Sequence, residues 1–406
     1  MSRSGGSKDG DGGGDRERDD RPKKKKDRAK SIVYGGPPTR RGQAAVVTRD
    51  VSVTLGDAAG THDNNAPVTL RPGTYVEVTI PRNLPGTSMC EVFSGHDAGQ
   101  YAHIPNEALA VQPKIAETSE TKDVRKHAVY AEYRGPLWRG KPKPADVNQG
   151  TLNDCRLMAA ELALAQDAPG AIMDAFQDDR PNQTSYAVRL FRDQGKRMEP
   201  VTVTVDTRLP SLDEANDWET PEGGVSEPED LSPIYAGYGE AKYDASPAST
   251  KVPLWPMLLE KAVAGLDKGD GYDSLNSGGA STEALATFLG RDQGRVHGWV
   301  DADQAMTTLR AAEAKNEAVI CGTKNPKDHE QTPKMLKYNV HPWHAYVLDD
   351  IQGDKLKFRN PWGTEQPRLV DANAFSYMFA NIQTVPLDDV KTVKEAKQDD
   401  KKKRDD

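Results

Sequence analysis

Three residue types that together can make a thiolate nucleophile occur in the order cysteine, histidine, asparagine along the chain. Cys155 follows Asp154 at the apparent start of a helix, where unpaired backbone N–H groups favour a thiolate. His344 begins the β-like segment HAYVLDD, and Asn360 ends the segment KLKFRN. An imidazole accepts the thiol proton, and an amide oxygen fixes the tautomer of that imidazole. A lone cysteine is more often an inert buried side chain, so the set as a whole predicts nucleophilic catalysis.

A side-chain amide lies six residues before this cysteine. Gln149 can donate a hydrogen bond to an oxyanion that forms beside the sulfur. The other two cysteines have weaker claims, because Cys321 stands in the apolar run EAVICG of a predicted buried strand and Cys90 lies in a β-rich N-terminal segment. Three cysteines allow at most one disulfide, which excludes a disulfide-stapled secreted scaffold.

The elements that must position these residues read as mixed α and β. Helical spacing is present in LNDCRLMAAELALAQ and in LWPMLLEKAVAGL, and STEALATFLG predicts a short helix capped by Ser281 or Thr282. Strict alternation in VTVTVDTRLP predicts a strand that ends at Pro210. The segments HAYVLDD and KLKFRN read as two further strands, joined by the turn IQGD. The segment 211–230 has eight acidic residues and no basic one, which predicts a loop.

Six of these motifs resemble the calpain family, in the order that the family has them. DVNQGTLNDCRLMAA resembles the calpain active-site pattern D-x-x-Q-G-x-L-G-D-C-W-L-L-A-A, HAYVLDD resembles its G-H-A-Y segment, and RNPWG is identical to its asparagine segment. The segments PLWPMLLEKAVAGL, SLNSGGASTEALATFLG and VTVTVDTRLP are similar to its W-x-x-L-L-E-K-A-Y-A-K-L helix, its S-G-G-x-x-x-E segment and its V-x-V-D-D-x-L-P strand.

This resemblance implies an α+β, papain-like cysteine endopeptidase core made of two subdomains. A helical subdomain with the cysteine would span 120–267, and a β-rich subdomain with the histidine and asparagine would span 268–388. Carried over residue by residue, the resemblance makes Cys155 the nucleophile, His344 the general base and acid, and Asn360 its orienting partner. It also makes Gln149 the oxyanion-hole donor and Trp362 a shield for the hydrogen bond between asparagine and histidine.

The chain departs from the calpain pattern at three positions near the site. Asn153 replaces a glycine, Arg156 replaces a tryptophan, and Trp343 replaces the glycine before the histidine. As a neighbouring cation, Arg156 is expected to lower the pKa of the thiol. It also removes an aromatic side chain that normally packs beneath the site, so these changes bear on the geometry and leave the class intact.

Calpain cores bind calcium on each subdomain, and the resemblance carries that implication to two residues. Asp146 matches a carboxylate ligand of the first site, and Glu199 falls where a second carboxylate is expected; oxygen ligands suit calcium. A structural salt bridge is the alternative role for both. The second calcium site is absent, because the segment after RNPWG lacks the family's acidic cluster. The sequence itself requires no cofactor.

Short β-like segments separated by turn residues fill 44–113, and they predict a small β-barrel. The run MCEVFSGHDAGQYAHIPNEAL resembles the end of bacterial Src-homology-3-like domains, which implies a peptide or cell-wall ligand; a purely structural cap is the alternative. The flanking segments 1–43 and 389–406 are charged and almost without apolar residues, which predicts disordered tails.

Composition limits the partners and the compartment. The net charge of −8 argues against nucleic-acid binding, and no apolar run reaches the ~18–20 residues that a membrane-spanning helix needs. The N-terminus has no apolar core of a secretory signal, so the expected compartment is the cytoplasm, with signal-independent export left open. Protein or peptide substrates are the expected partners.

Two other functions fit parts of the pattern. A catalytically inactive, calpain-fold binding protein would be expected to lack the nucleophile, the base or the orienting residue, and none is missing. A transglutaminase-like enzyme would keep the thioester and transfer the acyl group to an amine, but such enzymes usually orient the histidine with aspartate, so Asn360 argues against it.

Overall fold

The structure is a computed structural model of the chain. It describes residues 34–35, 43–56, 67–84, 86–92, 99–116, 128–177, 180, 183–195, 197–213, 231–236, 252–266, 271–298, 301–325 and 331–387. The predicted C-terminal tail 389–406, almost all of the predicted N-terminal tail 1–43, and the acidic residues 214–230 lie outside the described residues. No helix in the described ranges is long and apolar enough to cross a membrane.

An antiparallel five-stranded sheet forms most of the β-rich region near the N-terminus. Its order is β7-β6-β5-β2-β8, with bounds β2 (Gln43–Val47), β5 (Tyr75–Leu84), β6 (Thr87–Val92), β7 (Tyr101–Pro105) and β8 (Leu109–Val111). A hairpin of β3 (Val51–Val53) and β4 (Val68–Leu70) shares one hydrophobic core with this sheet. In this order β7 and β8 are edge strands, so closure into a barrel stays a prediction.

A four-stranded sheet and a long hairpin follow. The sheet has the order β1-β9-β12-β13, with bounds β1 (Tyr34–Gly35), β9 (Ala128–Glu132), β12 (Arg208–Asp213) and β13 (Leu231–Pro233). The hairpin pairs β10 (Ser185–Asp193) with β11 (Met198–Asp206). The expected single strand ending at Pro210 is therefore wrong, because the chain changes sheets at Thr207. There its N–H bonds the Thr184 carbonyl at 3.0 Å, and its carbonyl accepts from Tyr133 N–H at 2.8 Å.

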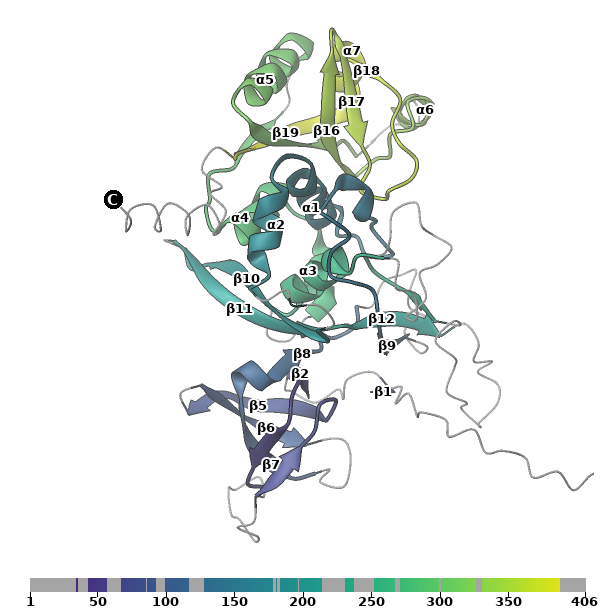
Figure 1. The fold of residues 1–406 in the computed structure, drawn as a ribbon. Helices are drawn as coiled ribbons and strands as arrows, with labels where there is room; N and C mark the ends of the chain where they lie inside the picture. The colour runs from purple at the N-terminus through teal and green to yellow at the C-terminus, as the bar shows by residue number, and fades with distance from the viewer. Residues whose placement is uncertain are drawn as a thin grey trace, which may run out of the picture. The chain divides into compact units, whose positions relative to one another are not determined.

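Four helices pack around one hydrophobic core beside the hairpin. They are α1 (Cys155–Asp167), α2 (Pro169–Ala175), α3 (Trp255–Ala264) and α4 (Ser281–Leu289). Figure 1 shows them gathered between the β10–β11 hairpin and the C-terminal sheet, in agreement with the contacts of α2, α3 and α4 with β10 and of α1 with that sheet. Helices are thus confirmed in the three segments where they were predicted, LNDCRLMAAELALAQ, LWPMLLEKAVAGL and STEALATFLG.

The start of α4 differs from the expectation. Its N-cap is Ala280, and neither Ser281 nor Thr282 acts as the cap. Both residues lie inside the first turn, and their N–H groups donate to Gln383 Oε1 at 2.7 and 3.3 Å. A glutamine a hundred residues further along the chain therefore satisfies this helix end, which local sequence reasoning cannot detect.

A six-stranded antiparallel sheet forms the C-terminal part, in the order β14-β19-β15-β16-β17-β18. Its strands are β14 (Arg295–Gly298), β15 (Glu317–Thr323), β16 (Ala345–Gln352), β17 (Lys355–Arg359), β18 (Val370–Asp371) and β19 (Phe379–Pro386). Three helices accompany it: α5 (Ala302–Ala314), α6 (Gln331–Lys337) and α7 (Ala372–Met378).

Both faces of this sheet are buried, and alternate residues of β15 show it. Ala318 and Ile320 join the core of α1 to α4, whereas Val319 and Cys321 join a second core with residues of α5 and α7. The prediction that Cys321 is a buried strand residue is confirmed. The fold is mixed α and β as predicted. The boundary at 268 between two subdomains stays a prediction, and α4, beyond it, packs against α1 and β10.

A buried cation joins the end of β8 to the core that follows. Lys261 is fully buried, and its Nζ donates to Asp206 Oδ1 at 2.6 Å, to the Arg208 carbonyl at 2.6 Å and to Gln112 Oε1 at 3.2 Å. The Gln112 amide also donates to Asp206 Oδ1 at 2.7 Å. Because the ammonium is paired and hydrogen-bonded, its burial is offset within the network.

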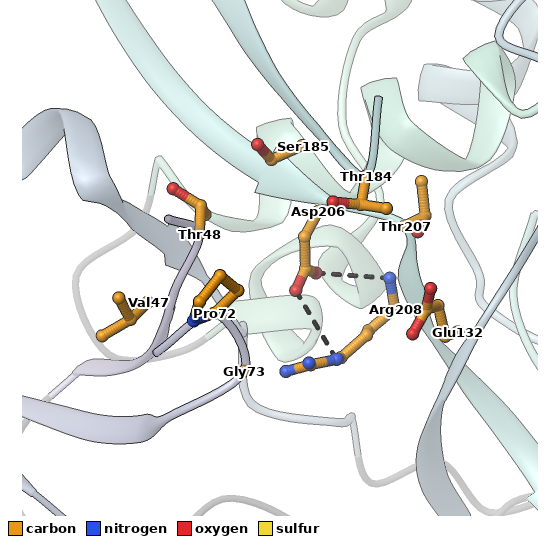
Figure 2. A pocket seen from close by; sticks show the side chains of 10 residues that line it. All are labelled: Val47, Thr48, Pro72, Gly73, Glu132, Thr184, Ser185, Asp206, Thr207 and Arg208. Atoms are coloured by element: carbon orange, nitrogen blue, oxygen red, sulfur yellow. Dashed lines mark hydrogen bonds and ion pairs between the residues drawn. The ribbon is translucent and has the colours of Figure 1, made fainter. Parts of the chain in front are cut away.

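A pocket of about 220 Å³ lies beside this network. Figure 2 shows its lining residues, which include the turn at Pro72 and Gly73 and the segment Asp206–Arg208. Within the pocket, Arg208 Nε lies 3.9 Å from Asp206 Oδ2. None of the residues predicted to take part in catalysis lines it.

Candidate active site

The predicted nucleophile occupies the first position of α1. Asp154 is the N-cap residue, and Cys155 is half-buried behind it. The backbone N–H of Ala345 is close enough to the Cys155 sulfur to lower the pKa of the thiol. Ala345 is the first residue of β16 and directly follows His344. The fold therefore brings the start of α1 to the start of β16, which places the thiol next to the segment that carries the predicted base.

The predicted base and its orienting residue are in direct contact. His344 Nε2 lies 2.8 Å from Asn360 Oδ1, and the two side chains are 6% and 1% exposed. The Asn360 amide is fixed from both ends, because its Nδ2 donates to the Glu365 carbonyl at 3.2 Å and its Oδ1 accepts from Trp362 N–H at 3.1 Å. Since Oδ1 faces the ring, Nε2 must carry the proton, and the neutral imidazole keeps Nδ1 as a proton acceptor.

The backbone that carries the histidine is held by one hydroxyl group. Thr323, the last residue of β15, accepts from His344 N–H at 2.8 Å and donates to the His341 carbonyl at 2.8 Å. Its own N–H bonds the His344 carbonyl at 2.9 Å. Sequence reasoning missed this residue, because a threonine at a strand end carries no signal that points to a histidine twenty-one residues later.

Aromatic rings enclose the imidazole. The Trp362 ring lies against His344 with centroids 4.6 Å apart and against His341 at 4.4 Å. Tyr346 meets the His344 ring edge-on at 4.9 Å. Trp362 is thus packed on the ring that makes the hydrogen bond to Asn360. Its role as a shield from water stays a prediction.

Burial sets the protonation of the thiol and the imidazole. It lowers the pKa of His344 to about 4, with a further contribution from His341 and an opposing one from Asn360. Burial raises the pKa of the Cys155 thiol, and the neighbouring Asp154 raises it further. The pair is therefore a neutral thiol and a neutral imidazole near pH 7.

Arg156 lowers the pKa of the Cys155 thiol as expected, but the net shift of that pKa is upward. The Arg156 N–H and guanidinium do lower that pKa, but burial outweighs them. The guanidinium is also directed toward a second partner, with Arg156 Nη1 3.7 Å from Glu283 Oε2 on α4. The arginine that replaces the calpain tryptophan therefore places a cation, paired with Glu283, beside the predicted nucleophile.

Three carboxyl groups near Cys155 are buried, and their burial was not predicted from the sequence. Asp154 and Glu161 are 0% exposed and Glu260 is 2% exposed. Burial raises the pKa of Asp154 to about 7 and the pKa values of both glutamates well above the usual range, and Asp154 raises the pKa of each glutamate further. Burial therefore favours the protonated form of both glutamates. The available signal was a glutamate inside each of the apolar runs LMAAELAL and PMLLEKA.

Gln149, the predicted oxyanion donor, makes a hydrogen bond between the cysteine side and the histidine side of the site. Gln149 N–H donates to the Pro361 carbonyl at 2.8 Å, which joins the loop before Cys155 to the segment after Asn360. Its side-chain Nε2 donates to the Leu152 carbonyl at 2.6 Å. The amide has a second N–H, so its role at an oxyanion stays a prediction.

The two residues predicted to bind calcium have other partners. Asp146 Oδ2 accepts from Trp255 Nε1 at 3.1 Å and from Lys143 N–H at 3.1 Å. Glu199 pairs with Arg197 at 2.6 Å, which is the structural salt bridge named as the alternative. Within the described ranges, no group of three or more His, Cys, Asp or Glu residues is arranged to hold a metal ion. These contacts do not fit a calcium site, and calcium binding stays an untested prediction.

Comparisons with known proteins agree with the resemblance read from the motifs. Residues 228–400 match the family model described as calpain family cysteine protease, a range that includes His344, Asn360 and Trp362 and begins after Cys155. Calpain-A and Calpain-B of Drosophila melanogaster are each 28% identical over 236 residues, which is 54% of this chain. The match covers 24% and 22% of those two proteins, so the chain spans about a quarter of their length. The chain is therefore similar, over these ranges, to the protease core of calpain-family cysteine proteases.

Proposed function

We propose that the protein is a cysteine endopeptidase that hydrolyses peptide bonds in protein substrates through Cys155, His344 and Asn360. One observation carries the proposal. The 2.8 Å contact from His344 Nε2 to an Asn360 amide of fixed orientation leaves Nδ1 as the acceptor, and the next backbone N–H, of Ala345, is close enough to the Cys155 sulfur to lower the pKa of the thiol. A base with this tautomer beside a thiol is what thiol activation requires.

Acylation begins from the neutral pair. As the Cys155 sulfur attacks the peptide carbonyl carbon, its proton passes to His344 Nδ1, and a carbon–sulfur bond replaces the carbonyl π bond. The backbone N–H of Cys155, at the start of α1, and the Gln149 amide are the donors proposed for the resulting oxyanion. Asn360 stabilises the imidazolium by accepting a hydrogen bond from its Nε2–H.

Collapse of the oxyanion breaks the carbon–nitrogen bond, and His344 gives its proton to the leaving amine. A water molecule then transfers a proton to Nδ1 while its oxygen adds to the thioester carbon. The carbon–sulfur bond breaks, the acid product leaves, and the sulfur recovers its proton. Packing of Trp362 on the imidazole at 4.6 Å supports the exclusion of water from the His344–Asn360 bond during these steps.

A digest of casein and of a peptide library tests the proposal, with wild type compared to Cys155→Ala and to Cys90→Ala as a control for the loss of a thiol. We expect Cys155→Ala to lose at least about 1,000-fold in kcat/KM, since it removes the nucleophile. Cys90 is buried in β6, so its variant should keep its activity when folded.

Reactions in ¹⁸O-labelled water separate hydrolysis from acyl transfer, because only hydrolysis places the label in the new carboxylate. Undiminished cleavage by Cys155→Ala would contradict the proposal. Products extended by an added amine, without label, would favour the transglutaminase-like alternative.

A further inference from the structure

The residue directly before the proposed base is an exposed tryptophan. Trp343 is 68% exposed, more than any other large apolar side chain in the described part of the chain. Its backbone lies in the left-handed region, with φ of 54°. Both features are unfavourable for a large aromatic residue, because the indole is left in water and its Cβ crowds the backbone.

Glycine adopts this backbone conformation without the steric cost, and glycine is the residue of the calpain pattern at this position. A tryptophan at this position is therefore less favourable for the turn than glycine would be. Neither the turn nor the hydrophobic core benefits from the change, since the side chain points out of both. A cost of this kind next to a reacting group is consistent with a role in binding.

The backbone on each side of Trp343 is fixed, so the strain is imposed by the surrounding structure. Trp343 N–H donates to the Lys324 carbonyl at 3.3 Å, and the next N–H, of His344, is held by Thr323 at 2.8 Å. On the other side, His341 N–H donates to the Tyr346 hydroxyl at 2.8 Å. The indole itself has no ring or cation partner among the described residues, so a rigid turn presents an aromatic face to solvent.

The position of this face limits what it can touch. Consecutive Cα atoms are about 3.8 Å apart, so the tryptophan backbone lies one residue from the proposed base. An extended substrate advances roughly 3.3–3.6 Å per residue. The indole can therefore reach substrate side chains within about two residues of the bond that is cut.

We infer that Trp343 is a specificity-determining residue, which packs its indole against a large apolar or aromatic side chain of the substrate within two residues of the cleaved bond. The inference rests on the proposed function. An apolar partner is favoured because an exposed indole gains most from contact with another apolar surface, while the nearby Lys324 ammonium is already held by the Ser376 carbonyl at 2.7 Å. The exposed apolar face then becomes buried when substrate binds.

Peptide libraries that vary one position at a time test the inference, with wild type, Trp343→Gly and Trp343→Phe. Leu336→Ala is the matched control, since Leu336 is another exposed apolar residue, 52% exposed on α6. For peptides with Phe or Leu at the preferred position, we expect Trp343→Gly to lower kcat/KM about tenfold, mainly through KM. Peptides with Ala there should change less than about twofold, and Trp343→Phe should keep most of the preference.

Equal losses for all peptides would overturn the inference, because they would mean that Trp343 acts through the position of His344. A wild-type preference for Lys or Arg at that position would also overturn it, in favour of a cation–π contact.

Binding to inactive protein separates this inference from the proposed function. Cys155→Ala and Cys155→Ala/Trp343→Gly are titrated with fluorescent Phe and Ala peptides, and the Phe peptide should bind about tenfold more weakly to the double variant. If no variant cleaves peptide yet this difference appears, the proposed function fails and the inference stands. Equal binding by the two variants, or no binding of the Phe peptide to Cys155→Ala, overturns the inference whatever the catalytic result.

Discussion

The two sides of the candidate active site are stabilised in different ways. On the histidine side, hydrogen bonds fix each polar group: Thr323 holds the backbone, Asn360 holds the ring, and the Asn360 amide is itself held from both ends. On the cysteine side, Cys155 begins helix α1, whose N-cap Asp154 and inner residue Glu161 are buried carboxyls, and Glu260 of α3 is a third. Both oxygens of Glu161 lack a hydrogen-bond partner among the described residues.

The two sides therefore have different effects: the histidine side sets the geometry of the site, and the cysteine side sets its electrostatics. The histidine side determines where the proton acceptor points, and it does so at little energetic cost because its polar groups are satisfied. The cysteine side determines how readily the thiol ionises, since a negative charge on Asp154 raises the pKa of the Cys155 thiol. Changes on the first side should therefore alter rate, and changes on the second side should alter stability and pH dependence.

The largest effect is expected from breaking the histidine side. His344→Ala removes the proton acceptor while Asn360 and the thiol remain, and kcat/KM should fall about 1,000-fold or more. His297→Ala, on β14 of the same sheet, is the control and should stay within about twofold of wild type. A His344→Ala protein that folds and retains a tenth of its activity would show that another group is the base.

The next effect concerns stability on the cysteine side. In the folded protein the pKa of Glu161 is raised by burial, so the group stays protonated while the unfolded chain ionises. The stability of the native form is thus greatest below the usual carboxyl pKa and falls as the pH rises above it. Glu161→Leu removes this cost and should stabilise the protein by about 2 kcal/mol at pH 8 and by much less at pH 4.5.

Urea unfolding at the two pH values measures this difference. Glu313→Leu, at an exposed position of α5, serves as the control and should change stability by less than about 0.5 kcal/mol at either pH. A gain from Glu161→Leu of the same size at both pH values would mean that apolar packing, and not the ionisation of the carboxyl, is responsible.

A third effect concerns the pH dependence of the rate, which the pKa of His344 should control. Because burial lowers the pKa of His344 to about 4, the neutral base persists in mild acid, and activity should be lost only as the pH falls toward that value. At pH 5.5, kcat/KM should stay within about twofold of its value at pH 7, whereas an imidazole of ordinary pKa would be only about a tenth neutral.

Fluorogenic peptide hydrolysis between pH 4 and 8 gives the acid limb. His341→Gln should move that limb to higher pH, since His341 contributes to the low pKa of His344. An acid limb near pH 6.5 in wild type would argue that the imidazole is more solvated than its burial implies.

The smallest effect is expected from calcium. Asp146 and Glu199 have partners that do not fit a metal site, so activity in chelator and in millimolar calcium should differ by less than about twofold. Asp146→Asn should leave that ratio unchanged. Activity that is absent in chelator and restored by calcium would instead place ligands in the acidic residues 214–230.

Much of the site could be predicted because its residues lie in short local motifs. The spacing of Gln149 and Cys155, the helix that Cys155 begins, and the strands next to His344 and Asn360 are all visible in the sequence. A local pattern specifies a local element, and the calpain order of the motifs supplies the long-range pairing. The contact between His344 and Asn360 follows from two antiparallel strands joined by a short turn.

What could not be predicted depends on contacts between distant residues. The first N–H groups of α4 donate to Gln383, the chain leaves the β10–β11 hairpin at Thr207, and Thr323 holds the histidine backbone. The direction of the Cys155 pKa also required the structure. A helix start and an adjacent arginine are sequence features that lower it, but burial is a tertiary property, and here burial has the larger effect.

Because the ammonium group of Lys261 is fully buried, its chemical labelling can report unfolding of the surrounding structure. An amine reagent must reach an unprotonated, accessible nitrogen, and this nitrogen is 0% exposed with all of its hydrogen bonds made inside the protein. Its acylation therefore requires the segment at Gln112, the strand ends at Asp206 and Arg208, and helix α3 to separate. Labelling of Lys261, followed over time by mass spectrometry beside the exposed lysines, thus counts openings of this junction and not surface fluctuations.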